Sequence, residues 1–289
     1  MSTMEPLVTI EDLRVRFHTR TRLVEAVRGI SFSIGREKVG IVGESGSGKT
    51  MTGRSILRLI RPPGEVTATR IDFDGEDILN ASEARMRQIR GDRISMVMQD
   101  PKYSLNPVMK IGRQISEAYR VHSGASRREA HAKALEMLEA VRIRDPERVC
   151  NAYPHEVSGG MGQRIMIAMM LIPDPDLLIA DEPTSALDVT VQMQVLAILD
   201  DLVTDRGMGL MFISHDLNLV ASFCDRVIIM YAGQIVETCK ASELAQATHP
   251  YTRGLLASLP RVDQPVGELP VLRREESWRT EKGVDGYLR

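Results

Sequence analysis

The chain has 289 residues, a length that allows a substantial hydrophobic core in one large domain or two small ones. Its 37 basic residues are balanced by 39 acidic ones, so nothing in the charge supports binding to a nucleic-acid backbone. The longest apolar run, 165–173, is far shorter than the ~20 residues of a membrane-spanning helix, and no apolar stretch near the N-terminus indicates a secretion signal.

The first part of the chain is predicted to contain antiparallel strands, followed by alternating strands and helices. Apolar and polar residues alternate over 7–34, which indicates antiparallel strands. A short apolar strand at 38–42 leads through a glycine-rich loop into a helix at 51–60, which Pro62-Pro63-Gly64 ends. The next predicted elements are a strand at 71–75 that runs into a turn, a helix at 81–90 and a strand at 94–98.

From 111 to 172 the apolar periodicity is helical, and Ser126 with Glu129 forms a capping box at the start of one helix. The alternation then resumes with a strand at 177–180, a helix at 190–204, a strand at 210–213, a short helix and a strand at 226–230. Strands that alternate with helices indicate a parallel sheet covered on both faces. The sequence therefore predicts an α/β fold with a helical insert.

The loop after the strand at 38–42 has the phosphate-binding pattern G-x-x-x-x-G-K-[ST]. It reads Gly43, Glu44, Ser45, Gly46, Ser47, Gly48, Lys49, Thr50. The glycines allow backbone N–H groups to face phosphate oxygens, Lys49 would reach the β- and γ-phosphates, and the Thr50 hydroxyl would bind Mg²⁺. The helix that follows places its N-terminus beside the negative charge. These residues predict a nucleotide site.

Polar side chains follow three of the predicted strands. Asp181 and Glu182 end the apolar strand at 177–180, Gln99 follows the strand at 94–98, and His215 follows the strand at 210–213. We expect Asp181 to hold Mg²⁺ and Glu182 to face the attacking water. His215 is placed to contact the γ-phosphate and the water.

A second anion-binding loop is predicted at Ser158, Gly159 and Gly160. It opens a helix that continues through Met161, Gly162, Gln163 and Arg164. A serine and two glycines before a helix form a backbone nest for an anion. Two such nests, far apart in one sequence, suggest that two copies each contribute one nest to a shared nucleotide.

Together these residues resemble the nucleotide-binding subunit of an ABC transporter, over about 6–265. The family's motifs occur in its order: Walker A at Gly43–Thr50, the Q-loop Gln99, the signature at Ser158–Gln163, Walker B at Leu177–Glu182, the D-loop at Ser185–Asp188 and the switch His215. The resemblance implies a P-loop NTPase (RecA-like) core with a mostly parallel sheet. It adds an N-terminal antiparallel β subdomain and an inserted α-helical subdomain.

The domain boundaries follow from this resemblance. The ATP-binding domain is expected at 6–260, with the helical insert at about 100–165. A C-terminal extension is expected at 241–275, and a poorly ordered tail at 276–289, where the sequence is charged and aperiodic.

A narrower resemblance points to the oligopeptide/dipeptide/nickel import branch. It is carried by Gln99-Asp100-Pro101, Ser104-Leu105-Asn106-Pro107 and His249-Pro250-Tyr251-Thr252-Arg253-Gly254-Leu255-Leu256. The chain departs from the branch at Val157, where Leu is usual, and at Gly162, where Arg is usual. Because the serine and glycines are intact, we expect activity to survive. No cysteine follows Cys239, so no iron–sulfur site is expected. The three cysteines have no metal spacing and fit a reducing compartment.

The resemblance implies a head-to-tail dimer that hydrolyses two ATP molecules. Ser158, Gly159, Gly160 and Gln163 would act on the partner's ATP, and the D-loop would contribute Asp188. Phe17 would stack on adenine. Mg²⁺ would be bound through Thr50, Gln99 and Asp181, and Glu182, His215 and Gln99 would be catalytic.

The implied partners are two permease subunits, a second ATP-binding subunit (a homologue or another copy of the chain) and an extracytoplasmic solute-binding protein, with no nucleic acid. The implied location is the cytoplasmic face of the bacterial inner membrane, as a peripheral subunit. Peptides are the expected substrate, with nickel or another small solute as the alternative. The alternative classes are a separately encoded exporter ATPase, a different P-loop ATPase or kinase, and a DNA-repair ATPase. The last would need a long coiled coil or zinc cysteines, which the sequence lacks.

Overall fold

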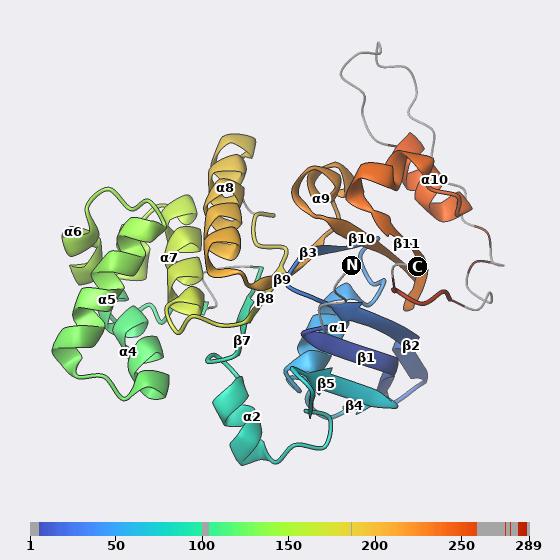
Figure 1. Ribbon diagram of the computed structural model, residues 1–289, viewed down its shortest axis with the longest axis horizontal. Helices are drawn as coiled ribbons and strands as arrows, with labels where there is room; N and C mark the ends of the chain where they lie inside the picture. Colours follow the sequence, from blue (N-terminus) through green and yellow to red (C-terminus); the bar gives the residue numbers. More distant parts are fainter. Residues whose placement is uncertain are drawn as a thin grey trace, which may run out of the picture. The chain divides into compact units, whose positions relative to one another are not determined.

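The computed structural model describes residues 6–99, 104–185, 187–258, 275, 278 and 283–287. The chain divides into two compact units (Figure 1). The first unit comprises Met1–Ala81 and Met211–Arg289, and the second comprises Ser82–Leu210. The chain passes from the second unit to the first within one strand, β9 (Gly209–Ser214).

The first unit contains an antiparallel sheet built from the N-terminal part of the chain. Its strands are β1 (Val8–His18), β2 (Leu23–Ile34), β4 (Gly64–Thr67), β5 (Arg70–Phe73) and β6 (Glu76–Asp77). The order is β2-β1-β5-β6, and β4 also pairs with β1. Val8 and Ile10 are fully buried, because alternate residues of a strand point to the same face. After an irregularity in the pairing with β2, the alternation resumes with the buried Leu13 and Val15. The predicted antiparallel strands are confirmed, whereas β4 was not predicted.

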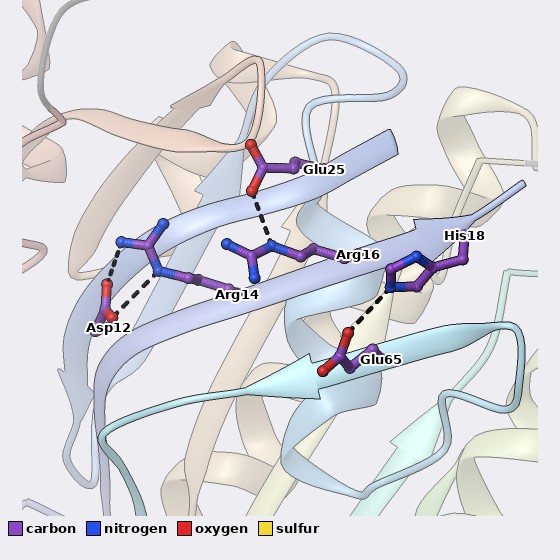
Figure 2. A network of polar contacts seen from close by, with 6 residues as sticks. All are labelled: Asp12, Arg14, Arg16, His18, Glu25 and Glu65. Carbon is purple, nitrogen blue, oxygen red and sulfur yellow. Dashed lines mark hydrogen bonds and ion pairs between the residues drawn. The ribbon is translucent and has the colours of Figure 1, made fainter. Parts of the chain in front are cut away.

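The exposed face of this sheet carries ion pairs (Figure 2). Arg14 pairs with Asp12 at 2.8 Å on the same strand, and Arg16 pairs with Glu25 of β2 at 2.9 Å. His18 lies 3.1 Å from Glu65 of β4. Exposed pairs of this kind contribute about 0–1 kcal/mol each. These ion pairs are compatible with the observed pairing register of the strands, but the buried apolar face of the sheet is what specifies that register.

A second sheet contains the strand that precedes the phosphate loop. In the first unit its order is β11 (Gln234–Lys240), β10 (Arg226–Tyr231), β3 (Lys38–Val42) and β9. β10 is parallel to β3 and antiparallel to β11. The predicted strands at 38–42, 210–213 and 226–230 are confirmed, but β11 was not predicted.

The helices of the first unit are α1 (Lys49–Ile56), α9 (Leu217–Phe223) and α10 (Pro250–Ala257), together with the 3₁₀ helix η2 (Ala241–Gln246). The helix predicted at 51–60 is therefore displaced toward the N-terminus. Gly48, at φ +102°, is its N-cap, and Arg58 adopts a left-handed φ of +51° just after its end. Left-handed residues do not continue a right-handed helix.

The second unit combines two parallel strands with most of the helices. The strands are β7 (Ile94–Val97) and β8 (Leu177–Asp181), paired in parallel. The helices are α2 (Glu83–Ile89), α4 (Ile111–Ser123), α5 (Arg127–Ala140), α6 (Pro146–Asn151), η1 (Pro154–Glu156), α7 (Gly159–Leu171) and α8 (Val189–Arg206). The predicted capping box at Ser126 and Glu129 is present at the start of α5.

These elements confirm the predicted fold class. The sheet is mixed and mostly parallel, an antiparallel β subdomain precedes it, and α4–α7 gather into a helical group within the second unit (Figure 1). Within the described ranges, no helix combines the length and the apolarity needed to cross a lipid bilayer.

Most of the predicted C-terminal tail lies outside the described residues. Of 276–289, the structure describes Trp278 and 283–287. Val284 donates a backbone hydrogen bond to Ile235 of β11 at 2.8 Å, and Gly286 donates one to Ser31 of β2 at 2.7 Å. These five residues therefore lie along both sheets of the first unit.

Candidate nucleotide-binding site

The phosphate loop joins β3 to α1, and its path requires glycine. A Cβ at Gly43 would lie 2.1 Å from the carbonyl oxygen of Met230, and one at Gly48 would lie 2.5 Å from that of Ala26. Gly46 and Gly48 also have φ values of +81° and +102°, which residues with side chains rarely adopt. The loop therefore packs its backbone directly against the neighbouring backbone of Met230 and Ala26.

Lys49 begins α1 and is 6% exposed. Its Nζ donates hydrogen bonds to the carbonyl oxygens of Gly43 at 2.7 Å and Glu44 at 3.0 Å. The Ser47 amide also donates to Glu44 O at 3.1 Å. The ammonium group is thus held inside the loop, where it can exchange carbonyl oxygens for phosphate oxygens.

Two further features of the loop fit a bound triphosphate. Ser47 is 3% exposed, and its hydroxyl oxygen is buried without a hydrogen-bond partner among the described residues. Buried hydroxyls are normally paired, so this atom suits a polar ligand. Thr50 lies in the first turn of α1, where the helix dipole favours negative charge.

The first unit also contains Phe17 and His215. Phe17, near the end of β1, is half-buried, and a Cβ at Gly64 would come within 2.8 Å of its ring. His215 is exposed in the turn between β9 and α9, where the Asp216 amide donates to Ser214 Oγ at 3.0 Å. The ring of Phe17 therefore packs on β4, and its predicted stacking on adenine stays a prediction.

In the second unit the structure brings Gln99 and Glu182 together. They follow β7 and β8, and Gln99 Nε2 donates a hydrogen bond to Glu182 Oε2 at 3.1 Å. The neighbouring Asp181 is buried at 5% exposure at the end of β8. These groups present carboxylate and amide oxygens, which are the ligands that Mg²⁺ prefers.

Glu182 has an unusual backbone conformation. Its φ is +46°, in the left-handed region, which costs a residue with a Cβ about 1 kcal/mol. Its carbonyl oxygen accepts hydrogen bonds from the Ser185 amide at 3.3 Å and hydroxyl at 3.2 Å. This turn directs the carboxylate away from the strand and toward Gln99.

The predicted signature segment begins α7. Ser158 is exposed and is the N-cap, since its hydroxyl accepts a hydrogen bond from the Met161 amide at 3.3 Å. Gly159 has open space around its Cα, whereas a Cβ on Gly160 would lie 2.6 Å from Val191 Cγ1 of α8. Gly160 thus permits close helix packing, and Ser158 and Gly159 form the accessible surface.

Gln163 and Asp188 lie in different surroundings, although both were predicted to act near the nucleotide. Gln163 is 2% exposed, and its Nε2 has no hydrogen-bond partner among the described residues. Asp188 is exposed and caps α8, because its carboxylate accepts a hydrogen bond from the Val191 amide at 3.0 Å. Of the D-loop, Ala186 lies outside the described residues, as do Asp100 and Pro101 of the segment after Gln99.

Sequence patterns did not indicate which residues support the phosphate loop from a distance. Gly233 donates its amide to Ser47 O at 3.1 Å, and the Glu44 amide donates to the Tyr251 hydroxyl at 3.1 Å. Tyr251 belongs to a segment that the sequence marked as branch-like, but the pattern held no sign of this contact.

Comparison with known proteins agrees with these motifs. The sequence profile described as "ABC transporter" matches residues 27–185. The chain is 49% identical, over 92% of its length and 83% of the relative's, to a probable peptide ABC transporter ATP-binding protein of Sinorhizobium fredii (strain NBRC 101917 / NGR234). It is 48% identical, over 89% of its length and 73% of the relative's, to the oligopeptide transport ATP-binding protein of Bacillus subtilis (strain 168).

A solved structure supports the same assignment. It is a dimeric post-hydrolysis state of an ATP-binding cassette bound to ADP and Pi, 26% identical, with a TM-score of 0.73. The match covers 81% of this chain and 98% of that one. The chain therefore belongs to the ABC transporter family, as an ATPase subunit of the branch that also contains the oligopeptide import proteins.

Proposed function

We propose that this chain binds ATP with Mg²⁺ and couples its hydrolysis to the import of peptides through a separate permease. The observation that carries the catalytic part is the hydrogen bond from Gln99 to Glu182, in a chain that also has a built phosphate loop. The amide donates to this carboxylate at the end of β8, and a carboxylate held in this way can orient or deprotonate a water molecule.

The residues divide into binding and catalytic roles. The phosphate loop from Gly43 to Thr50 binds the triphosphate, and Lys49 exchanges its carbonyl partners for the β- and γ-phosphates. The Thr50 hydroxyl, the Asp181 carboxylate and the Gln99 amide would hold Mg²⁺, which neutralises phosphate charge when bound. Glu182 acts as base, and His215 donates a hydrogen bond to the γ-phosphate region.

The exposed Ser158 and Gly159 act on an ATP molecule held by a second ATP-binding subunit. This subunit is another copy or a homologue, in a head-to-tail pair whose closed form ATP favours. The dimeric state of the solved cassette supports this arrangement. We further propose two permease subunits and an extracytoplasmic solute-binding protein as partners, at the cytoplasmic face of the bacterial inner membrane.

The substrate proposal is supported by the names of the relatives, which refer to peptides and oligopeptides. Uptake of labelled peptides by a strain that lacks this chain, with and without the restored wild type, tests it directly. If the restored wild type recovers uptake of nickel or another small solute and not of peptides, the transported substrate is that solute.

The catalytic proposal is tested by Glu182→Gln in the purified complex. This change keeps the size of the side chain but removes its basicity. We expect ATP binding to be retained and turnover to fall by ~10²-fold or more. Glu136→Gln, an exposed change on α5, is the matched control and should keep wild-type turnover. Hydrolysis at the wild-type rate in Glu182→Gln would remove Glu182 from its proposed role.

A further inference from the structure

Helix α10 reaches the phosphate loop from the C-terminal part of the chain. Tyr251, in its first turn, is fully buried. Its hydroxyl oxygen accepts a hydrogen bond from the backbone amide of Glu44 at 3.1 Å, across 207 residues of sequence. The contact lies within the first unit and is made to the backbone, so it depends on Tyr251 and not on the side chain of residue 44.

Glu44 is the residue on which the hydrogen bonds of the phosphate loop converge. Its carbonyl oxygen accepts from Lys49 Nζ at 3.0 Å and from the Ser47 amide at 3.1 Å, while its amide is held by Tyr251. A backbone N–H that is removed from water needs a partner, which fixes its direction. Because the carbonyl of Gly43 shares a peptide plane with the Glu44 amide, Tyr251 also orients an oxygen that binds Lys49.

The Tyr251 ring is itself held in place. It lies 4.5 Å from the Tyr231 ring and 6.2 Å from the Trp278 ring, between centroids. The start of α10 is anchored to β11, where Glu237 Oε1 accepts from the Thr248 amide at 2.6 Å and the His249 amide at 3.3 Å. His249 then caps α10, since its Nδ1 accepts from the Tyr251 amide at 3.2 Å. Ring contacts and hydrogen bonds therefore fix the position of the Tyr251 side chain whose hydroxyl meets the loop.

We propose that Tyr251 is a positioning residue for ATP binding, which holds the Glu44 peptide so that the phosphate loop is preformed for the nucleotide. The inference rests on the proposed role of the phosphate loop. It gives the segment His249–Leu256 a function in the nucleotide site. Without the hydroxyl, the phosphate loop becomes ordered only when ATP binds. The free energy spent on this ordering lowers the affinity for ATP.

Tyr251→Phe tests this, because it removes the hydroxyl and keeps the ring. The measurements are the Kd for Mg-ATP in the purified chain, the rise in unfolding temperature caused by ATP, and kcat and KM of the purified complex. We expect the Kd and KM to increase about 3- to 10-fold, as for one lost hydrogen bond, with kcat within about twofold of the wild type. The ATP-induced rise in unfolding temperature should shrink.

Tyr231→Phe is the matched control, since it removes a hydroxyl from the same aromatic cluster. We expect wild-type ATP affinity from it. A wild-type Kd in Tyr251→Phe, or an equal loss in both variants, would overturn the proposal. If Tyr251→Phe lowers the unfolding temperature by the same amount with and without ATP, Tyr251 has only a packing role. Lys49→Ala tests the function of the phosphate loop separately from the positioning role of Tyr251. Undiminished ATP binding in that variant would contradict the proposed function of the loop itself.

Discussion

Gly43 and Gly46 lie in the same phosphate loop, but glycine is required at the two positions for different reasons. At Gly43 a methyl group would overlap the Met230 carbonyl oxygen, at 2.1 Å, and approach Ser47 Oγ, at 2.7 Å. At Gly46 nothing lies within 4 Å of the added Cβ, and only the φ of +81° is unfavourable. The first position is limited by space and the second by backbone conformation.

We therefore expect Gly43→Ala to lower the free energy of unfolding by about 3 kcal/mol, because the backbone of β10 must move, and to abolish ATP binding. Gly46→Ala should cost about 1 kcal/mol, the strain of a left-handed alanine. Urea unfolding and ATP titration of the two variants provide the comparison. The steric explanation fails if Gly46→Ala is as destabilising as Gly43→Ala.

At the scale of single elements, helix α5 shows how a local sequence pattern produces a defined helix start. The Ser126 hydroxyl accepts from the Glu129 amide at 3.3 Å, and the Glu129 carboxylate accepts from the Ser126 amide at 2.9 Å. The backbone hydrogen bond from Ser126, and then its side-chain hydrogen bond, hold the pKa of Glu129 below its ordinary value of 4.5. A lowered pKa means that the folded helix favours the ionised carboxylate.

The contribution of Glu129 should thus be present above pH 4.5 and be lost as the pH falls through its folded pKa. We expect Glu129→Ala to reduce hydrogen-exchange protection in the first turn of α5 at pH 7, and the difference from wild type to shrink at pH 4 and below. Ser126→Ala should weaken the same turn by about 1 kcal/mol. Glu136→Ala, which removes an exposed pair with Lys133 on the same helix, is the control. If the loss of hydrogen-exchange protection in Glu129→Ala grows as the pH falls, the capping role of Glu129 is contradicted.

The elements that the sequence predicted well are those whose cause is local. The strand, loop and helix of the phosphate-loop motif, the capping box and the helix that opens at Ser158 each depend on a few consecutive residues, and the structure has all three. Strand β11 was missed because its residues are half-buried at several positions and lack a clean alternation. The end of α1 was misplaced because the left-handed Arg58 carries no sequence signal.

At the scale of the whole molecule, contacts between residues that are far apart in the sequence could not be predicted from the sequence. The Gln99–Glu182 pair was only implied by strand ends, because its hydrogen bond joins residues 83 positions apart. The contact between Tyr251 and Glu44 was not predicted at all. Gln163 is predicted, with Ser158 and Gly159, to act on the partner's ATP, and the sequence did not show that the helical rotation of α7 buries its side chain inside the second unit. Which side chains a fold buries is decided by packing, which a linear motif does not contain.

A shared nucleotide site between two copies of the chain can be tested by mixing two inactive variants. Lys49→Ala removes the phosphate-loop cation. Ser158→Asp places a carboxylate where the partner's ATP would lie, and it keeps a good N-cap for α7, because Asp caps helices as well as Ser. Either variant alone has one defect in every site of a head-to-tail dimer.

A mixed dimer, however, contains one site with both functional parts, because the phosphate loop of one variant faces the signature of the other. We expect an equimolar mixture to recover about a quarter of wild-type ATPase activity, since random pairing makes half the dimers mixed and each has one intact site of two. Ser126→Asp, a substitution at another N-cap serine of the second unit, should keep full activity by itself. If wild-type chain is active and the mixture stays at the background of its components, each nucleotide is bound and hydrolysed within one copy, and Ser158 acts on no partner.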